Sequence, residues 1–249
     1  MKMRFFAGLA GAAILAGCTN AGGSGDTALA ADYGKAADAL IAKLGPGKPI
    51  PPATDPDVRA YEAQASKATA AIGTDTLPAT SFDTFGALCG KATTIIQAYL
   101  HGGAAGEASP EAMNANAVRY IGQLFTPLLF SARCTAAHLP FVETTLSEQD
   151  LKDKPQAVQQ IRGGAFGQAT GLLQIATDPS LDAPRRKRAI DLLAGDAGKF
   201  AIVFNAEQRR QLADAARQAQ ATLPPELKSQ AERISTDIAS APCGKLCTA

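Results

Sequence analysis

The chain has 249 residues, enough for one helical domain or two small ones, and its formal net charge at pH 7 is +1. A chain so close to neutrality lacks the basic surplus that attracts nucleic acid, so we expect no nucleic-acid partner. Hydrophobic residues make up 46% of the chain but aromatic residues only 6%, and tryptophan is absent. The core must therefore consist mainly of Ala, Leu and Ile side chains, which favours closely packed helices.

Residues 1–17 have the parts of a secretory signal peptide. Lys2 and Arg4 supply positive charge, residues 5–15 form an apolar centre, and two small residues follow at 16–17. The apolar stretch is shorter than the roughly 20 residues that a membrane-spanning helix needs. We expect it to direct export and to be removed, which leaves 22 basic and 23 acidic residues and a formal charge of −1.

The signal ends in the run Leu15-Ala16-Gly17-Cys18, which resembles the lipobox of bacterial lipoproteins. The resemblance covers the N-terminus only. It implies that the Cys18 thiol carries diacylglycerol, that Cys18 is the first mature residue, and that acyl chains such as palmitate anchor the protein in a membrane. The next residue is Thr19 and not the aspartate that retains such proteins at the inner membrane, so we expect an outer-membrane anchor with the protein facing the periplasm. The competing interpretation is an ordinary signal peptide that ends near a cysteine.

A flexible tether and then a helical domain are expected after the signal. Residues 18–30 begin with small polar residues that bury little apolar surface, which is typical of a tether. Residues 31–249 form the predicted helical domain, with an internal break near 45–55 where glycine and proline interrupt an Ala-rich helix. No stretch shows sustained strand alternation. We therefore predict an all-α fold, a multi-helix bundle with short Pro/Gly-rich connections and disulfide staples.

The spacing of apolar residues predicts the helices of that domain. A helix that begins after Ser109 places Val118 and later apolar residues on one buried face and is kinked at Pro127. Turns are expected near Pro140 and at 153–155. The other predicted helices cover residues 56–72, 81–100, 156–175, 182–204, 205–223 and 224–239.

Four cysteines follow Cys18, an even number in an exported chain, so disulfides are expected. Local pairing of Cys89 with Cys134 and of Cys243 with Cys247 is favoured over a bond from the tail to the helical body. A catalytic redox pair would have two intervening residues, whereas the tail pair has three.

Neither a metal nor a cofactor is expected. The chain has only two histidines, and the strongest metal combination would join Cys134 to His138, four residues apart on a helix, with Cys89 or His101 as a third ligand. Both histidines have ordinary explanations. His101 ends a helix, where it interacts with the helix terminus, and His138 is expected as a half-buried packing residue.

Sequence signatures of catalysis are also missing. The chain contains no serine-hydrolase, zinc-protease, phosphate-loop or calcium-loop motif. His101 and His138 are the residues around which an enzyme site would have to be assembled. Among the carboxylates, nothing in the spacing of Glu143 and Glu148 brings them together as an acid/base pair.

Glycines recur every fourth residue within a predicted helix, at Gly163, Gly167 and Gly171. Each glycine costs about 1 kcal/mol relative to alanine in a helix interior, so the pattern needs a reason. Glycines at this spacing form a flat stripe that lets another backbone come close. Packing of a second helix of the chain is one explanation, and a ligand or partner is the other.

Four consecutive basic residues lie near the start of a predicted helix: Arg185, Arg186, Lys187 and Arg188. The helix dipole disfavours positive charge there, although Asp182 and Asp191 offset part of the effect. The run is either a solvated face or a contact for anionic lipid, lipopolysaccharide or an acidic partner.

These observations predict an envelope lipoprotein that acts by non-catalytic binding. Its partner would be an envelope protein or an apolar ligand, bound by the C-terminal helical half that contains the glycine stripe and the basic run. An enzyme or metal-binding protein built around His101 or His138, and a structural envelope spacer, are the alternatives.

Overall fold

The computed structural model describes residues 28–73, 77, 82–104 and 108–248, with no side chains for 82–85. The predicted signal peptide, the lipidation residue Cys18 and the first part of the predicted tether lie outside the described residues. The end of that tether, residues 28–30, forms the first part of a helix.

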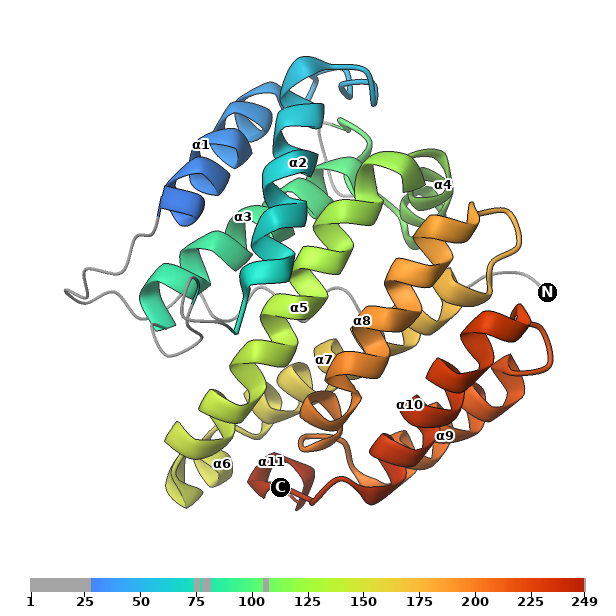
Figure 1. Ribbon diagram of the computed structural model, residues 1–249. Coiled ribbons are helices and arrows are strands. Elements are labelled where there is room, and N and C mark those ends of the chain that lie inside the picture. The colour runs from blue at the N-terminus through green and yellow to red at the C-terminus, as the bar shows by residue number, and fades with distance from the viewer. Residues whose placement is uncertain (1–27, 74–76, 78–81, 105–107, 249) are drawn as a thin grey trace. The chain divides into compact units, whose positions relative to one another are not determined.

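The described part of the chain is helical and contains no β-strand, which confirms the all-α prediction (Figure 1). The helices are α1 (Ala28–Lys43), α2 (Pro56–Ala71), α3 (Phe82–His101), α4 (Pro110–Arg119), α5 (Ile121–Thr145), α6 (Glu148–Asp153), α7 (Pro155–Thr177), α8 (Ala183–Ala201), α9 (Ala206–Ala219), the 3-10 helix η2 (Pro225–Leu227), α10 (Lys228–Ser240) and α11 (Lys245–Thr248).

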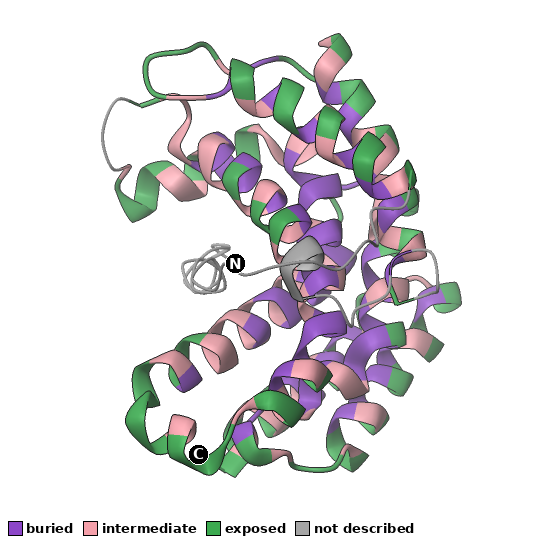
Figure 2. Cartoon of the chain, turned by 90° about the vertical axis from the view of Figure 1, so that its left-hand side faces the viewer, coloured by how far each residue is buried: buried purple, intermediate pink, exposed green. Residues whose placement is uncertain are grey.

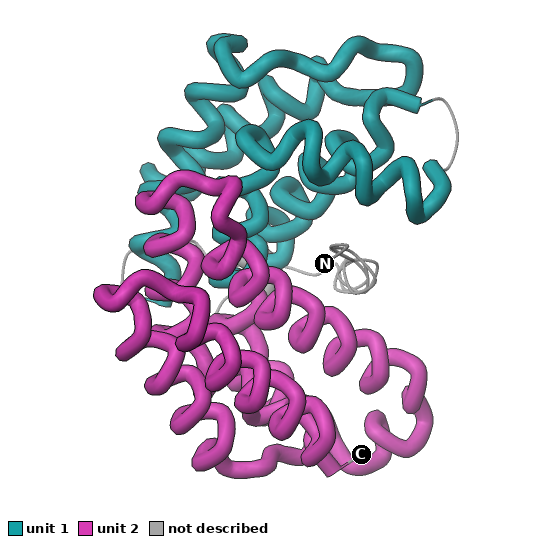
Figure 3. The backbone as a smooth tube through the Cα atoms, turned by 90° about the vertical axis from the view of Figure 1, so that its right-hand side faces the viewer, with its two compact units in different colours: residues 1–6, 13–134 teal, residues 7–12, 135–249 magenta. Residues whose placement is uncertain are grey.

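The chain divides into two compact units within α5 (Figure 3). Among the described residues, unit 1 ends at Cys134 and unit 2 begins at Thr135. In each unit, buried residues lie on the helix faces that meet neighbouring helices of that unit (Figure 2).

Unit 1 has a core of buried tyrosines. Tyr33 on α1 donates a hydrogen bond from its hydroxyl to the Leu88 carbonyl at 3.1 Å and stacks on Phe130 with ring centroids 4.5 Å apart. The Tyr61 hydroxyl lies 3.4 Å from that of Tyr33. Because these rings carry polar ends, the hydrogen bonds are what permit their complete burial.

The loop over residues 45–55, where an internal break was expected, lies inside unit 1 and connects α1 to α2. The Gly47 N–H donates to the Gly103 carbonyl at 2.9 Å. Gly103 has φ +74°, and a Cβ there would lie 2.4 Å from the Lys48 carbonyl oxygen, so the close approach of this loop requires glycine.

Unit 2 is built around α8, which packs against α7 and α10, while α10 also packs against α9. Local signals begin these helices as expected. The Asp182 side chain accepts from the Arg185 N–H at the start of α8, and Asn205 forms a capping box with Gln208 at the start of α9. The capping box of Asn205 with Gln208 also fixes where the turn between α8 and α9 ends.

Two details of the predicted helix after Ser109 are wrong. The predicted single helix is two helices, because α4 ends at Arg119 and Tyr120 leaves helical geometry before α5 begins. The break changes which face of α4 is buried, so Val118 is 64% exposed while its neighbour Ala117 is buried.

The turn expected at Pro140 does not occur, because α5 continues through both Pro127 and Pro140 to Thr145. Proline removes one backbone hydrogen bond from a helix. Burial of Leu139 and Val142 on either side of Pro140 stabilises the helix in spite of that loss.

Candidate functional site

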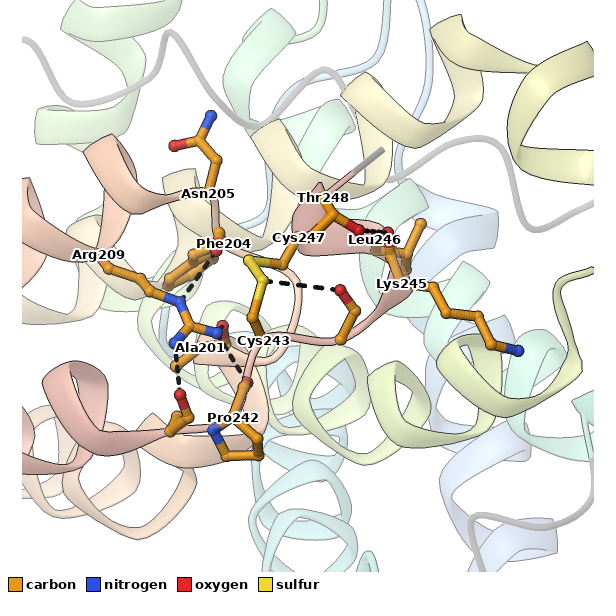
Figure 4. Close-up of a disulfide and its surroundings, with 12 residues drawn as sticks. Ala201, Phe204, Asn205, Arg209, Pro242, Cys243, Lys245, Leu246, Cys247 and Thr248 are labelled. Atoms are coloured by element: carbon orange, nitrogen blue, oxygen red, sulfur yellow. Dashed lines mark hydrogen bonds between the residues drawn. A yellow bond between two sulfur atoms is a disulfide. The ribbon is translucent and has the colours of Figure 1, made fainter. Parts of the chain in front are cut away.

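The disulfides form the predicted pairs. Cys89 on α3 is bonded to Cys134 on α5 within unit 1, and Cys243 is bonded to Cys247 at the end of unit 2 (Figure 4). Metal binding needs thiolates, which a disulfide does not offer. The metal combination of Cys134 with His138, with Cys89 or His101 as a third ligand, therefore has no thiolate from Cys134 or Cys89 in this state of the protein.

The two histidines belong to different units. His101 is the partly exposed last residue of α3. His138 on α5 is 3% exposed and so is buried, not half-buried as expected. Burial lowers the pKa of His138 to about 4, so the ring is neutral at pH 7.

Within the described residues, no three His, Cys, Asp or Glu side chains gather as a metal site would require. The same residues include no helix with both the length and the apolar character needed to cross a membrane.

Helix α7 has one face in the core of unit 2 and the glycines on the other. Its buried residues include Val158, Ala165, Ala169, Leu172 and Ala176, which follow the helical repeat, and the helix packs mainly against α8. At 100° per residue, the stripe of glycines lies on the opposite side of the helix. We call this side the outer face of α7, made of Gln160, Gly163, Gly167, Thr170, Gly171 and Gln174.

Within the described part of the chain, no other helix packs against the glycines at positions 163 and 171. Apart from the backbone of α7 itself, no described atom lies within 4 Å of the position that a Cβ would occupy at Gly163 or Gly171. Both residues and Gly167 are partly exposed. Among the described residues, the close approach of a second backbone therefore does not explain these two glycines.

The outer face of α7 carries no charge. Arg162 is the single charged residue among the 23 of this helix, and it lies off the outer face. The Thr170 hydroxyl, seven residues after Gly163, is buried and makes no hydrogen bond with the described residues. A buried hydroxyl without a hydrogen bond destabilises a protein, so a bound partner that offers a hydrogen bond to Thr170 would be stabilised by it.

The basic run at the start of α8 is paired with groups close to it. Its contacts within unit 2 include the ion pairs of Arg185 with Asp182 at 3.4 Å and of Lys187 with Asp191. The Arg186 guanidinium donates to the Ala176 carbonyl at 2.9 Å. The last contact satisfies an open carbonyl near the C-terminus of α7. These pairings agree with the solvated-face interpretation and give Arg186 a role in joining α7 to α8.

The structure also contains a cluster of contacts that sequence reasoning missed, where the C-terminal tail meets unit 2. The Glu143 carboxylate on α5 accepts hydrogen bonds from the backbone N–H groups of Lys245 and Leu246. A Cβ on Gly244 would lie 2.5 Å from the Glu143 carboxyl group, so any larger residue there would require this carboxyl group to move. Glu148, which sequence reasoning had weighed as a partner for Glu143, is an exposed residue at the start of α6.

Arg209 on α9 is the second anchor of this cluster (Figure 4). Its guanidinium donates to four backbone carbonyls: Phe204 at 3.0 Å, Ala201 at 2.6 Å, Pro242 at 2.8 Å, and Ala241. Burial lowers the pKa of Arg209, although the group stays charged. No local pattern distinguishes Arg209 from its neighbour Arg210, because its partners lie at or just beyond the ends of α8 and α10.

No family model, curated protein or solved structure matches this chain. A function must therefore be argued from the chemistry of the chain itself.

Proposed function

We propose that this chain is a lipid-anchored protein of the bacterial envelope that faces the periplasm and acts by binding, without catalysis. The lipobox-like run supports an anchor at Cys18, with Thr19 favouring the outer membrane. The pairing of all four later cysteines in disulfides supports an oxidising compartment outside the cytoplasm.

The observation that supports binding most directly is the open space at Gly163 and Gly171. Glycine in a helix costs about 1 kcal/mol relative to alanine, and the described part of the chain gains no packing from it at these positions. An outside backbone that approaches the outer face of α7 would use that space.

The chemistry of the outer face of α7 indicates which partner it fits. Glycine, glutamine and threonine provide close backbone approach and hydrogen bonds but little apolar area and no charge. We therefore propose a helix of another envelope protein, with small and uncharged residues at its contact face, in preference to an apolar ligand. The basic run at the start of α8 is not part of this surface.

Alanine substitutions test the surface without threatening the fold. Gly163→Ala and Gly171→Ala should each raise stability by up to about 1 kcal/mol, because alanine is the better helix former and nothing described obstructs its methyl group. Each should also weaken a discrete crosslinked adduct formed in cells by a photoreactive residue at Gln160 or Gln174. The same variants should complement a deletion mutant less well than the wild-type chain does.

The matched controls are Gly195→Ala and Gly198→Ala on α8, where the space beside the glycine is also open. They should stabilise the protein to a similar extent and leave the adduct and complementation unchanged. Unchanged adduct and complementation in the α7 variants would refute the proposed surface.

The enzyme alternative predicts a different result. Under it, His101→Ala or His138→Gln would abolish complementation while the protein folds normally.

For the anchor, Cys18→Ala should stop labelling by a fatty-acid analogue and release the protein from the membrane fraction. Labelling that persists in this variant would exclude lipidation at Cys18.

A further inference from the structure

The last described residues, 242–248, form a strap that contacts of three different helices hold on unit 2. Glu143 of α5 accepts from two of its backbone N–H groups, Arg162 of α7 donates to the Leu246 carbonyl, and Arg209 of α9 donates to the Pro242 carbonyl. The Leu246 side chain is fully buried. The Lys245 ammonium group also donates to the Leu146 carbonyl at 3.0 Å. The strap is therefore docked mainly by its backbone and by the buried Leu246 side chain.

The conformation of the strap is not one that so short a segment keeps by itself. Helix α11 has four residues, fewer than an isolated helix needs to overcome the cost of nucleation. The Cys243–Cys247 disulfide joins the residue before Gly244 to the third residue of α11. It restricts the undocked strap to conformations that already resemble the docked turn.

The size of this restriction follows from the length of the ring. In the chain-entropy model, closing a ring of five residues reduces the accessible conformations by about 30-fold. The reduced strap should therefore populate its undocked state about 30-fold more than the oxidised strap does, because its docking contacts are the same while its free state has more conformations.

The two disulfides differ in how a thiol can reach them. Cys243 is exposed and Cys247 partly exposed on unit 2, whereas in unit 1 Cys89 is partly exposed and Cys134 is 2% exposed. A thiolate can therefore approach the strap disulfide at the exposed Cys243 without any unfolding. The disulfide of unit 1 has no exposed residue, and attack on its Cys134 sulfur requires unit 1 to open.

We propose that the Cys243–Cys247 disulfide is a thiol–disulfide exchange site for a protein dithiol, and that its reduction releases the strap from unit 2. Neither effect depends on the outer face of α7.

The exchange proceeds in two balanced steps. A thiolate of the dithiol attacks the Cys243 sulfur, the bond between Cys243 and Cys247 breaks, and Cys247 leaves as a thiolate that takes a proton from water. The second thiolate of the dithiol then attacks the mixed disulfide and displaces Cys243, which is protonated in turn. Two electrons have passed to the strap, and the dithiol has become a disulfide.

Release of the strap changes what unit 2 presents to its surroundings. The Glu143 carboxylate and the Arg162 guanidinium lose their backbone partners, and the contact surface of Leu246 becomes accessible. The undocked state, which reduction populates about 30-fold more, therefore presents an apolar site flanked by one negative and one positive group.

The first test is a redox titration of the full mature chain in thiol buffers of graded potential, with thiol labelling and peptide mapping. Cys243 and Cys247 should become labelled while Cys89 and Cys134 remain bonded. If the Cys89–Cys134 disulfide opens first, or if both open together, the exchange site is refuted.

The second test measures amide hydrogen exchange of residues 245–246, whose N–H groups Glu143 protects. Reduction of the strap should accelerate their exchange about 30-fold and leave α8 unchanged. The double variant Cys243→Ser/Cys247→Ser should exchange like the reduced protein under all redox conditions. An acceleration below about threefold would refute release of the strap.

A third test addresses the dithiol. In the Cys247→Ser variant, Cys243 is first converted to a mixed disulfide with a small thiol. A CxxC-type protein that lacks its second cysteine should then displace the small thiol and become trapped as a mixed disulfide on Cys243. The matched Cys134→Ser variant, which leaves Cys89 with the same adduct, should trap far less. Equal trapping by both variants would overturn the assignment of the strap as the preferred site.

Discussion

Replacing Arg209 with methionine should lower the free energy of unfolding by about 3 kcal/mol, because one guanidinium satisfies four backbone carbonyls. Two of these carbonyls, of Ala201 and Phe204, lie at the end of α8, and the other two follow α10. Methionine keeps most of the apolar stem but has no donor, so the substitution separates hydrogen bonding from packing.

The magnitude follows from the burial of these bonds. A hydrogen bond from a charged donor contributes about 1.5 to 3 kcal/mol, and four such bonds would exceed any realistic single-residue effect. Arg209 is only partly buried, so water replaces part of what is lost. The expected effect is therefore about 3 kcal/mol, close to that of one or two such bonds, and Arg209→Lys should restore about 1 kcal/mol of it.

Equilibrium urea unfolding, followed by circular dichroism with both disulfides intact, measures the effect. The matched control is Arg210→Met, because Arg210 is the next residue of α9, has a 69% exposed side chain and forms an ion pair with Glu207 one turn earlier on the same helix. It should lose about 0.5 kcal/mol or less. If Arg209→Met loses less than about 1 kcal/mol at unchanged m-value, the carbonyl cluster does not stabilise unit 2 as argued.

Three further predictions concern other parts of the chain. Gly244→Ala should loosen the strap, because its methyl group would displace the Glu143 carboxylate, and hydrogen exchange at 245–246 should rise while global stability changes little. Since burial lowers the pKa of His138 to about 4 while an unfolded histidine titrates near 6.5, the unfolded chain takes up the proton first as the pH falls. Stability should therefore decline between pH 6.5 and 4, by up to about 3 kcal/mol, and His138→Leu should flatten that part of the pH profile in urea unfolding. Removal of the Cys89–Cys134 bond by double alanine substitution should cost about 4 kcal/mol, because the bond closes a loop with a sequence separation of 45, and thermal melts showing no loss would contradict the chain-entropy argument.

The sequence by itself determined the features that depend on neighbours a few residues away. The apolar spacing gave the all-α class and most helix positions, since a helix repeats every 3.6 residues regardless of what it packs against. Ser109, Asp182 and Asn205 could be recognised as starts because a cap acts on backbone groups two or three residues further on. The disulfide pairs followed from the order of the helices and from the shortness of the tail.

Only the tertiary structure decided the features that depend on residues far apart in the chain. Pro140 stays helical because of what surrounds it, and the described residues leave space beside Gly163 and Gly171 because unit 2 packs on the opposite side of α7. Glu143 and Arg209 became recognisable as anchors only once the tail lay beside them, at a sequence separation of 102 between Glu143 and Lys245. A carboxylate or a guanidinium looks the same in the sequence whether it faces water or a buried carbonyl, because burial is set by the packing of the whole unit and not by local spacing.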